Sequence, residues 1–187
     1  MEDLSLHMLD IMENSLAAQA RRIDVRIDED PQADLLTLEI RDDGKGMDAR
    51  TLQRALDPFF TTRTTRDVGL GLSMLAESAR ATGGDMTVDS RPGQGTRVKA
   101  TFRPGHIDMK PLGDIPQTIV TLLIGHPEVS LRYEHTAGGS SFEFDSNDLP
   151  EGSGPGVLRQ VAERIRRGLD ALAASAGKTR VTSSDRE

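Results

Sequence analysis

Two polar residues near the start of the chain, Asp10 and Asn14, have types and a spacing that suit metal chemistry. They stand four positions apart in a segment whose apolar residues repeat with helical period, so their side chains project from adjacent turns of one helix face. An amide oxygen beside a carboxylate suits a magnesium ion that carries phosphate ligands of its own, because Mg²⁺ prefers oxygen donors and keeps several waters. On its own, the pair is also explained by an ordinary solvated helix face.

A second candidate follows a strand-like segment, where Asp42 is succeeded by Gly44 and Gly46. A carboxylate at the end of a strand can accept a hydrogen bond from an exocyclic amine. The two glycines let the backbone turn sharply and let a flat ligand approach closely. A glycine turn between a strand and a helix accounts for these residues equally well.

Two more glycine-rich segments follow. Residues 69–72, GLGL, open a predicted helix after a polar stretch. Glycines there expose backbone N–H groups, and the helix dipole favours anions, so the segment is a candidate phosphate site. Residues 93–96, GQGT, enter a strand and are explained by a hairpin turn. No GxxxxGK[ST] loop occurs, which excludes a P-loop protein, and a dinucleotide-binding GxGxxG unit is unsupported.

Composition narrows the class of protein. The 187 residues have a formal net charge of −7 and no cysteine, which excludes disulfides, thiolate zinc sites and iron–sulfur clusters. An acidic chain gives no overall electrostatic case for binding nucleic acid. The longest apolar run, at residues 119–124, is far shorter than the roughly 18 residues of a membrane span, and the N-terminus does not resemble a signal peptide. We expect a soluble cytoplasmic protein.

Hydrophobic periodicity predicts an α+β fold for residues 1–103, a two-layer α/β sandwich with antiparallel strands and helices on one face. Residues 104–176 are expected to form a C-terminal extension of a short helix, a β-hairpin and an amphipathic helix, and residues 177–187 a disordered tail. The predicted helices are 4–18, 48–56, 70–81, 115–124 and 157–174, and the predicted strands are 23–27, 36–40, 86–88, 98–102, 129–135 and 141–145.

Together these motifs resemble, in order and context, the GHKL superfamily: the ATP-binding domain of gyrase B, Hsp90, histidine kinases and MutL. The similarity spans residues 4–103, is closest to the histidine-kinase-like ATPase domain, and implies the Bergerat ATP-binding fold. The matching segments are MLDIMENSLAAQARRIDVRI (8–27, N box), RDDGKGM (41–47, G1 box), DPFFTTR (57–63, F box), GLGLSM (69–74, G2 box) and RPGQGTRVKATF (91–102, final glycine motif and strand).

The resemblance implies a role for each matched residue. Asn14 would coordinate Mg²⁺ that bridges the ATP phosphates, and Asp42 would hydrogen-bond the adenine amino group. Residues 60–68 would form the ATP lid, from which Arg63 or Arg66 could reach the phosphates. The remaining implied contacts are Gly44, Gly46 and Met47 around the adenine, Phe60 at the start of the lid, Gly69, Leu70 and Gly71 along the phosphates with Leu72 next in the same motif, and Thr96 beside Asp42.

The chain also departs from the family pattern. Asp10 stands where MutL and gyrase carry a glutamate general base, and it loses roughly 1.3–1.5 Å of reach, although a base must come within about 3 Å of the water it activates. Ala17 stands where histidine kinases usually carry lysine. We expect no phosphoacceptor hairpin before the N box, and a local polar contact for His7. The remaining histidines, His106, His126 and His135, lack metal-ligand spacing and are assigned no functional role.

Three functions stay open from the sequence. The first, favoured by these departures and by the C-terminal extension, is an ATP- and Mg²⁺-binding regulatory or signalling subunit whose lid changes a protein-binding surface. The second is a protein kinase that transfers the γ-phosphate to a separate acceptor, similar to anti-sigma-factor kinases. The third is slow ATP hydrolysis. The first two require a partner protein, and the final helix can either pack on the domain or form a homodimer.

Overall fold

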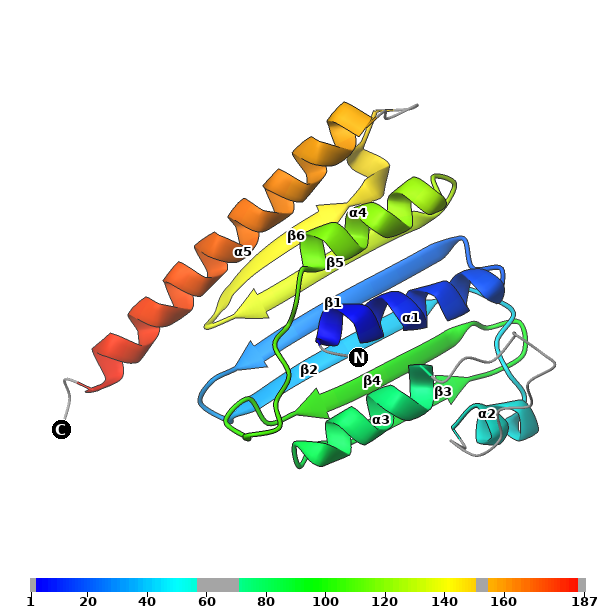
Figure 1. The fold of residues 1–187 in the computed structure, drawn as a ribbon, viewed down its shortest axis with the longest axis horizontal. Coiled ribbons are helices and arrows are strands. Elements are labelled where there is room, and N and C mark those ends of the chain that lie inside the picture. Colours follow the sequence, from blue (N-terminus) through cyan, green and yellow to red (C-terminus); the bar gives the residue numbers. More distant parts are fainter. Residues whose placement is uncertain (1–2, 57–70, 151–154, 185–187) are drawn as a thin grey trace.

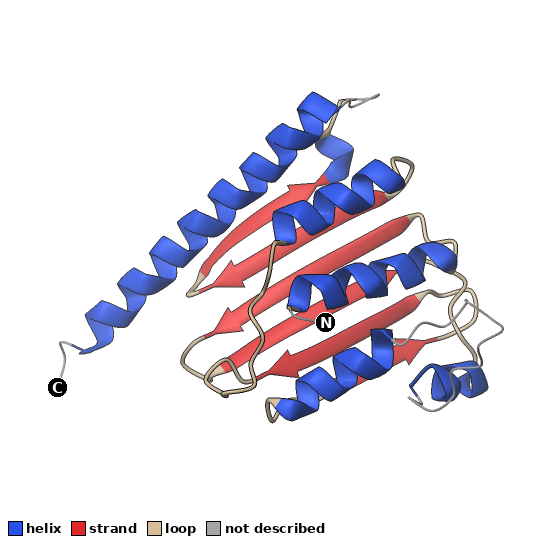
Figure 2. Cartoon of the chain, in the orientation of Figure 1, coloured by secondary structure: helices blue, strands red, loops and turns tan. Residues whose placement is uncertain are grey.

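The computed structural model describes residues 3–56, 71–150 and 155–184, which form one six-stranded sheet with α1, α3 and α4 on one face (Figures 1 and 2). The strand order is β3-β4-β2-β1-β5-β6. This mixed fold confirms the predicted α+β class. The elements are α1 (Leu4–Ala17), β1 (Arg22–Asp30), β2 (Leu35–Asp42), α2 (Ala49–Leu56), α3 (Gly71–Ala81), β3 (Met86–Ser90), β4 (Thr96–Phe102), α4 (Ile115–Gly125), β5 (Ser130–Ala137), β6 (Ser140–Asp145), a 3₁₀ turn (Ser146–Asp148) and α5 (Pro155–Ser184).

Apolar and polar side chains alternate along the central strands, and this alternation explains how the strands pack against the helices. In β1, Ile23, Val25 and Ile27 are buried, and the residues between them are polar. Because successive side chains of a strand point to opposite faces, every second residue enters the core beneath the helices and the others form a charged outer face. β2 and β5 repeat this pattern. The outer face of the sheet is therefore built from polar side chains of the same strands that build the core.

The first half of the chain pairs as predicted, and the second half joins the same sheet. β1–β2, β2–β4 and β3–β4 are antiparallel. β5 pairs with β1 in parallel, with Ile23 opposite Leu131, and β6 closes that edge. The predicted β-hairpin exists, but it extends the main sheet and does not stand apart from it. Local turn signals could not reveal this pairing, because β1 and β5 are far apart in sequence.

The last helix, α5, packs on α4, β5 and β6 through Val161, Ile165 and Leu172, all buried. Its backbone continues to Ser184, past residue 174, where the apolar repeat predicts its end, and through residues that the sequence predicts as a tail. No helix within the described ranges has both the length and the apolar character that crossing a membrane requires.

Shortening Ile165 tests whether α5 is part of this fold. The side chain of Ile165 is fully buried, so we expect Ile165→Ala to lower the free energy of unfolding by about 2–5 kcal/mol. Ile107 provides a matched control, because it is 95% exposed and Ile107→Ala removes the same atoms from solvent-exposed positions. Urea denaturation measures both variants. Equal losses of stability, or none for Ile165→Ala, would show that α5 does not contribute to the core.

Candidate functional site

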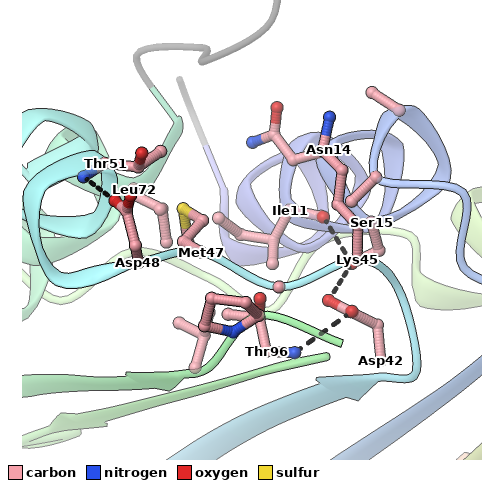
Figure 3. Close-up of a pocket in the computed structure, with 15 residues that line it drawn as sticks. Ile11, Asn14, Ser15, Asp42, Lys45, Met47, Asp48, Thr51, Leu72 and Thr96 are labelled. Carbon is pink, nitrogen blue, oxygen red and sulfur yellow. Dashed lines mark hydrogen bonds between the residues drawn. The ribbon is translucent and has the colours of Figure 1, made fainter. Parts of the chain in front are cut away.

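The carboxylate of Asp42, at the end of β2, is held by three hydrogen bonds and is only 8% exposed. Its Oδ1 accepts from the backbone N–H of Gly44 at 2.9 Å. Oδ1 also accepts from the N–H of Thr96 at 3.2 Å, and Oδ2 accepts from the Ser15 hydroxyl at 2.9 Å (Figure 3). The donors come from the loop after β2, from β4 and from α1. A carboxylate offers about four acceptor sites, so Asp42 keeps capacity for one more donor.

A cavity of about 410 Å³ opens beside Asp42. Its volume falls within the roughly 300–1,000 Å³ of small-molecule sites, which combine apolar walls with a few placed polar groups. The lining residues are Ile11, Asn14, Ser15, Ala17, Ala18, Asp42, Lys45, Gly46, Met47, Asp48, Thr51, Leu72, Pro92, Thr96 and Val98. The cavity therefore has the size and the mixed lining expected of a site for a flat, partly polar ligand.

The floor of the cavity is fixed by Ser90, whose hydroxyl oxygen accepts a hydrogen bond from the N–H of Met47 at 2.8 Å and lies 2.9 Å from the Thr96 hydroxyl. Gly46 has φ +64°, and a Cβ there would overlap the carbonyl of Arg91. Only glycine adopts this conformation without strain. The loop after β2 can therefore lie directly on the turn before β4.

Asp10 lies outside the cavity lining, where α1 meets the first residue of α3. A Cβ on Gly71 would overlap the Asp10 carboxylate, so a larger residue at this position would displace the Asp10 side chain. Burial raises the pKa of the Asp10 carboxyl above its usual value. A carboxylate with a raised pKa is a stronger proton acceptor than an exposed aspartate.

The oxygen donors of α1 fit a magnesium ion. Asn14 lines the cavity and Asp10 is one turn away on the same helix, which are the ligand types Mg²⁺ prefers. The described residues include no cluster of three or more His, Cys, Asp or Glu that could hold a metal ion.

The structure brings together a large part of the predicted site. Asn14, Asp42, Gly46, Met47, Leu72 and Thr96 line one cavity, and Gly44 supports Asp42 through its N–H. Gly71 and Asp10 lie next to each other outside the lining. The other predicted site residues, Phe60, Arg63, Gly69 and Leu70, fall within residues 57–70, outside the described ranges.

Sequence analysis missed several contributors to the site. Ser15 binds Asp42 and is 3% exposed, but a serine next to Asn14 carries no sequence signal until α1 is packed on β2. Lys45 is the one basic residue among the described lining residues. Asp48 accepts a hydrogen bond from the N–H of Thr51 at 2.7 Å and so caps α2 beside the cavity. This cap was readable, since an aspartate before a helical segment is a common start signal.

The prediction of a local polar contact for His7 is wrong. His7 is 0% exposed, and neither ring nitrogen has a hydrogen-bond partner among the described residues. Burial, aided by the positive charges of Lys110 and the N-terminus and opposed by Asp3, lowers the pKa of His7 to about 4. The helical wheel placed His7 with the polar residues, but α1 packs against both α3 and α4, which the pattern of a single helix does not show.

The remaining histidines also lie away from the cavity. His106 and His126 are within 3.6 Å of Asp108 and Glu128, and His135 is 2.6 Å from Glu29. None of them lines the cavity.

Comparison with known proteins assigns the chain to a family. A family model described as histidine kinase-, DNA gyrase B-, and HSP90-like ATPase matches residues 2–106, which include every described residue of the cavity. The chain belongs to this family. The resemblance drawn from the sequence motifs is thereby confirmed, and this part of the chain is an ATP-binding, histidine-kinase-like ATPase domain.

Among its relatives, the sensor kinase CckA of Brucella abortus is 38% identical over 104 residues, which are 55% of this chain and 11% of that protein. The sensor protein kinase FleS of Pseudomonas aeruginosa is 42% identical over 89 residues, 48% of this chain and 22% of that protein. The chain therefore matches less than a quarter of the length of either family member.

Among solved structures, the ATPase domain of Aquifex aeolicus MutL complexed with ADP superposes with a TM-score of 0.55 at 15% identity. The match covers 89% of this chain and 70% of that chain, more than residues 2–106 alone. At this identity the match shows the fold alone, and the shared fold includes part of the second half of the chain.

The buried imidazole of His7 should make folding sensitive to acid. The unfolded chain binds a proton at His7 near pH 6.5 and the folded chain only near pH 4. The folded state is therefore fully favoured above pH 6.5, and we expect its stability to fall by up to about 3 kcal/mol as the pH drops to 4. His7→Leu removes the titrating group, so its free energy of unfolding should vary less over this window.

Urea denaturation at several pH values measures this difference. His106 is partly exposed, so His106→Leu is a matched control that should keep the wild-type dependence on pH. The same dependence in His7→Leu as in the wild type would contradict the assignment of a buried neutral imidazole.

Proposed function

We propose that the chain is an ATP- and Mg²⁺-dependent regulatory or signalling subunit that uses nucleotide bound beside Asp42 to control contact with a partner protein. The observation that carries this proposal is the fixed Asp42 carboxylate, with spare acceptor capacity, at a 410 Å³ cavity within an ATP-binding family. The amino group of adenine is the donor that such a carboxylate suits. The ADP complex named for the MutL neighbour supports a nucleotide at this fold.

The residues around Asp42 would each contact a different part of the nucleotide. The apolar side chain of Met47 and the backbone at Gly46 suit the faces and edges of a flat base, and Thr96 stands beside Asp42 in the sheet register. Leu72 belongs to the first turn of α3, where N–H groups and the helix dipole favour phosphate. Among the described lining residues, Lys45 adds positive charge between Asp42 and Asp48.

Magnesium would enter with the nucleotide. Asn14 is the residue proposed to hold it, because its amide lines the cavity one turn from Asp10. When bound, the ion would offset the negative charge of the phosphates. The protein's own contribution is to hold Asn14 in position, which α1 does through its buried face.

Two observations favour regulation over phosphate transfer within this chain. His7 and His135 are buried, and His106 and His126 lie outside the cavity lining. The base position holds Asp10, whose side chain is shorter than glutamate. The printed names of CckA and FleS, both sensor kinases, favour the alternative of γ-phosphate transfer to a separate acceptor protein. The raised pKa of Asp10 favours the third alternative, slow hydrolysis.

Removing the charge of Asp42 tests the proposed site for the adenine base. Asp42→Asn turns one acceptor into a donor that faces the adenine amino group, and an unpaired buried donor costs about 1–3 kcal/mol. We therefore expect Mg-ATP to bind roughly ten- to hundredfold more weakly, as measured by calorimetry. Asp89→Asn makes the same chemical change at an exposed position of β3 and should bind as the wild type does. Absence of heat from the wild type at millimolar ATP, or equal affinity in both variants, would overturn the assignment.

The fate of the γ-phosphate separates the three functions. We expect ATP labelled at the γ-phosphate to remain bound and intact over an incubation with the purified chain. Label transferred to a co-purified protein and lost in Asn14→Ala would establish the kinase alternative. Phosphate released by the wild type and abolished in Asp10→Asn would establish hydrolysis. Glu13→Ala, an exposed change on the same helix, is the control for each assay.

A further inference from the structure

The outer face of the sheet carries an ordered set of charges that the nucleotide site does not use. Its ion pairs cross between neighbouring strands: Arg26 with Glu134 at 3.0 Å, and Arg97 with Glu39 at 2.8 Å. Both pairs are partly exposed, and exposed ion pairs add little to stability. The described helices α1, α3 and α4 lie on the opposite face (Figure 1), so this charged face is open for contact.

Four arginines surround one carboxylate on this face. Arg22 and Arg26 lie two residues before and after Asp24 on β1, and Arg41 and Arg132 stand opposite it on β2 and β5. We call these four residues the arginine ring. Asp24 bonds one of them, Arg22, through both Nε at 3.1 Å and an Nη at 2.9 Å. Glu39 and Glu134 line the same hollow, so four guanidinium groups stand beside three carboxylates in a chain that is acidic overall.

Two members of the arginine ring have donors without partners. The side chain of Arg41 makes no hydrogen bond or ion pair within residues 3–56, 71–150 and 155–184, and Arg41 stands opposite Arg97 in the β2–β4 register. Like charges in directly opposed positions are unfavourable. Arg132 pairs with Glu143, yet its Nε is buried and has no partner among the described residues. A buried donor left unpaired is unfavourable, because it has lost its hydrogen bonds to water.

These two sets of donors meet in one place. The arginine ring, with Asp24, Glu39 and Glu134, lines a shallow hollow of about 160 Å³. Arg41 and Arg132 reach it from opposite sides of β1. Guanidinium groups bind carboxylates through two parallel hydrogen bonds, so an acidic group in the hollow would pair with the unpaired guanidinium of Arg41, beside Arg132.

We infer that the hollow at the arginine ring is a docking point for an acidic side chain of a partner protein. Water and salt would screen the attraction between the arginines and a free small anion on an open face. A protein surface that covers the sheet excludes water and strengthens each ion pair. Glu39 and Glu134, which also line the hollow, are already paired with Arg97 and Arg26, so the donors of Arg41 remain for the acid of the partner.

This docking point goes beyond the proposed nucleotide function and does not require it. The two sites are nevertheless adjacent in sequence: Arg41 is on the outer face, and Asp42, the next residue of β2, faces the cavity. In addition, the Asp43 carboxylate accepts hydrogen bonds from the N–H groups of Arg21 and Arg22 at 2.8 and 2.9 Å. Neighbouring residues thus link the arginine ring to the loop that holds the cavity.

The test uses the full chain and a hexaglutamate peptide as a probe for acidic side chains. NMR of the arginine Nε–H groups reports contact at each residue. We expect the peptide to shift the Nε–H signals of Arg41 and Arg132 at low salt, and Arg41→Gln and Arg132→Gln each to weaken binding about tenfold. Arg41→Lys keeps the charge and loses the paired donors, so it should bind more weakly than the wild type.

Arg159→Gln is the matched control, because Arg159 is exposed on α5 away from the hollow; it should bind the peptide as the wild type does. Signals of Arg41 and Arg132 that do not move at millimolar peptide would overturn the inference. So would an equal loss in Arg159→Gln, which would indicate attraction by net charge alone. Inorganic pyrophosphate that shifts the same signals at lower concentration than the peptide would show a small-anion site and would also overturn it. Thermal melting of each variant checks that it is folded.

Discussion

A single buried carboxylate sets the geometry of the cavity. Burying an ionised carboxylate is unfavourable unless hydrogen bonds replace its water, and Asp42 receives them from three segments that are distant in sequence: α1, the loop after β2, and β4. The helix layer and the sheet are therefore joined by a polar contact at the end where the ligand is proposed to bind. A shift of α1 along the sheet would leave this carboxylate short of a donor.

The alternation of a strand explains how one short segment serves two surfaces. Leu38, Ile40 and Asp42 face the helices, and Glu39 and Arg41 face outward. A ligand in the cavity and a partner on the outer face would contact side chains of adjacent residues. The protein needs no long relay between them, because the two surfaces are separated by the thickness of one sheet.

Local patterns in the sequence predicted the elements well, and long-range packing was beyond them. Alternation identified β1 and β2, and the polar residues at positions 14, 42 and 96 converge as the family resemblance implies. The same patterns placed His7 on a polar face, although it is buried. The periodicity of α1 alone does not show which later segments of the chain pack against it. The parallel pairing of β5 with β1 could not be predicted from local patterns either, because the two strands are far apart in sequence.

The position of β1 between β2 and β5 has a consequence for dissecting the molecule. A fragment that ends near residue 103 would keep every motif of the ATPase family but lose the neighbour on one side of β1. The N–H and C=O groups that now pair with β5 would be bare, together with the apolar surface beneath α4. Such an unprotected edge is a template for self-association, so aggregation of the fragment would reflect its severed hydrogen bonds and not a defect of the nucleotide site.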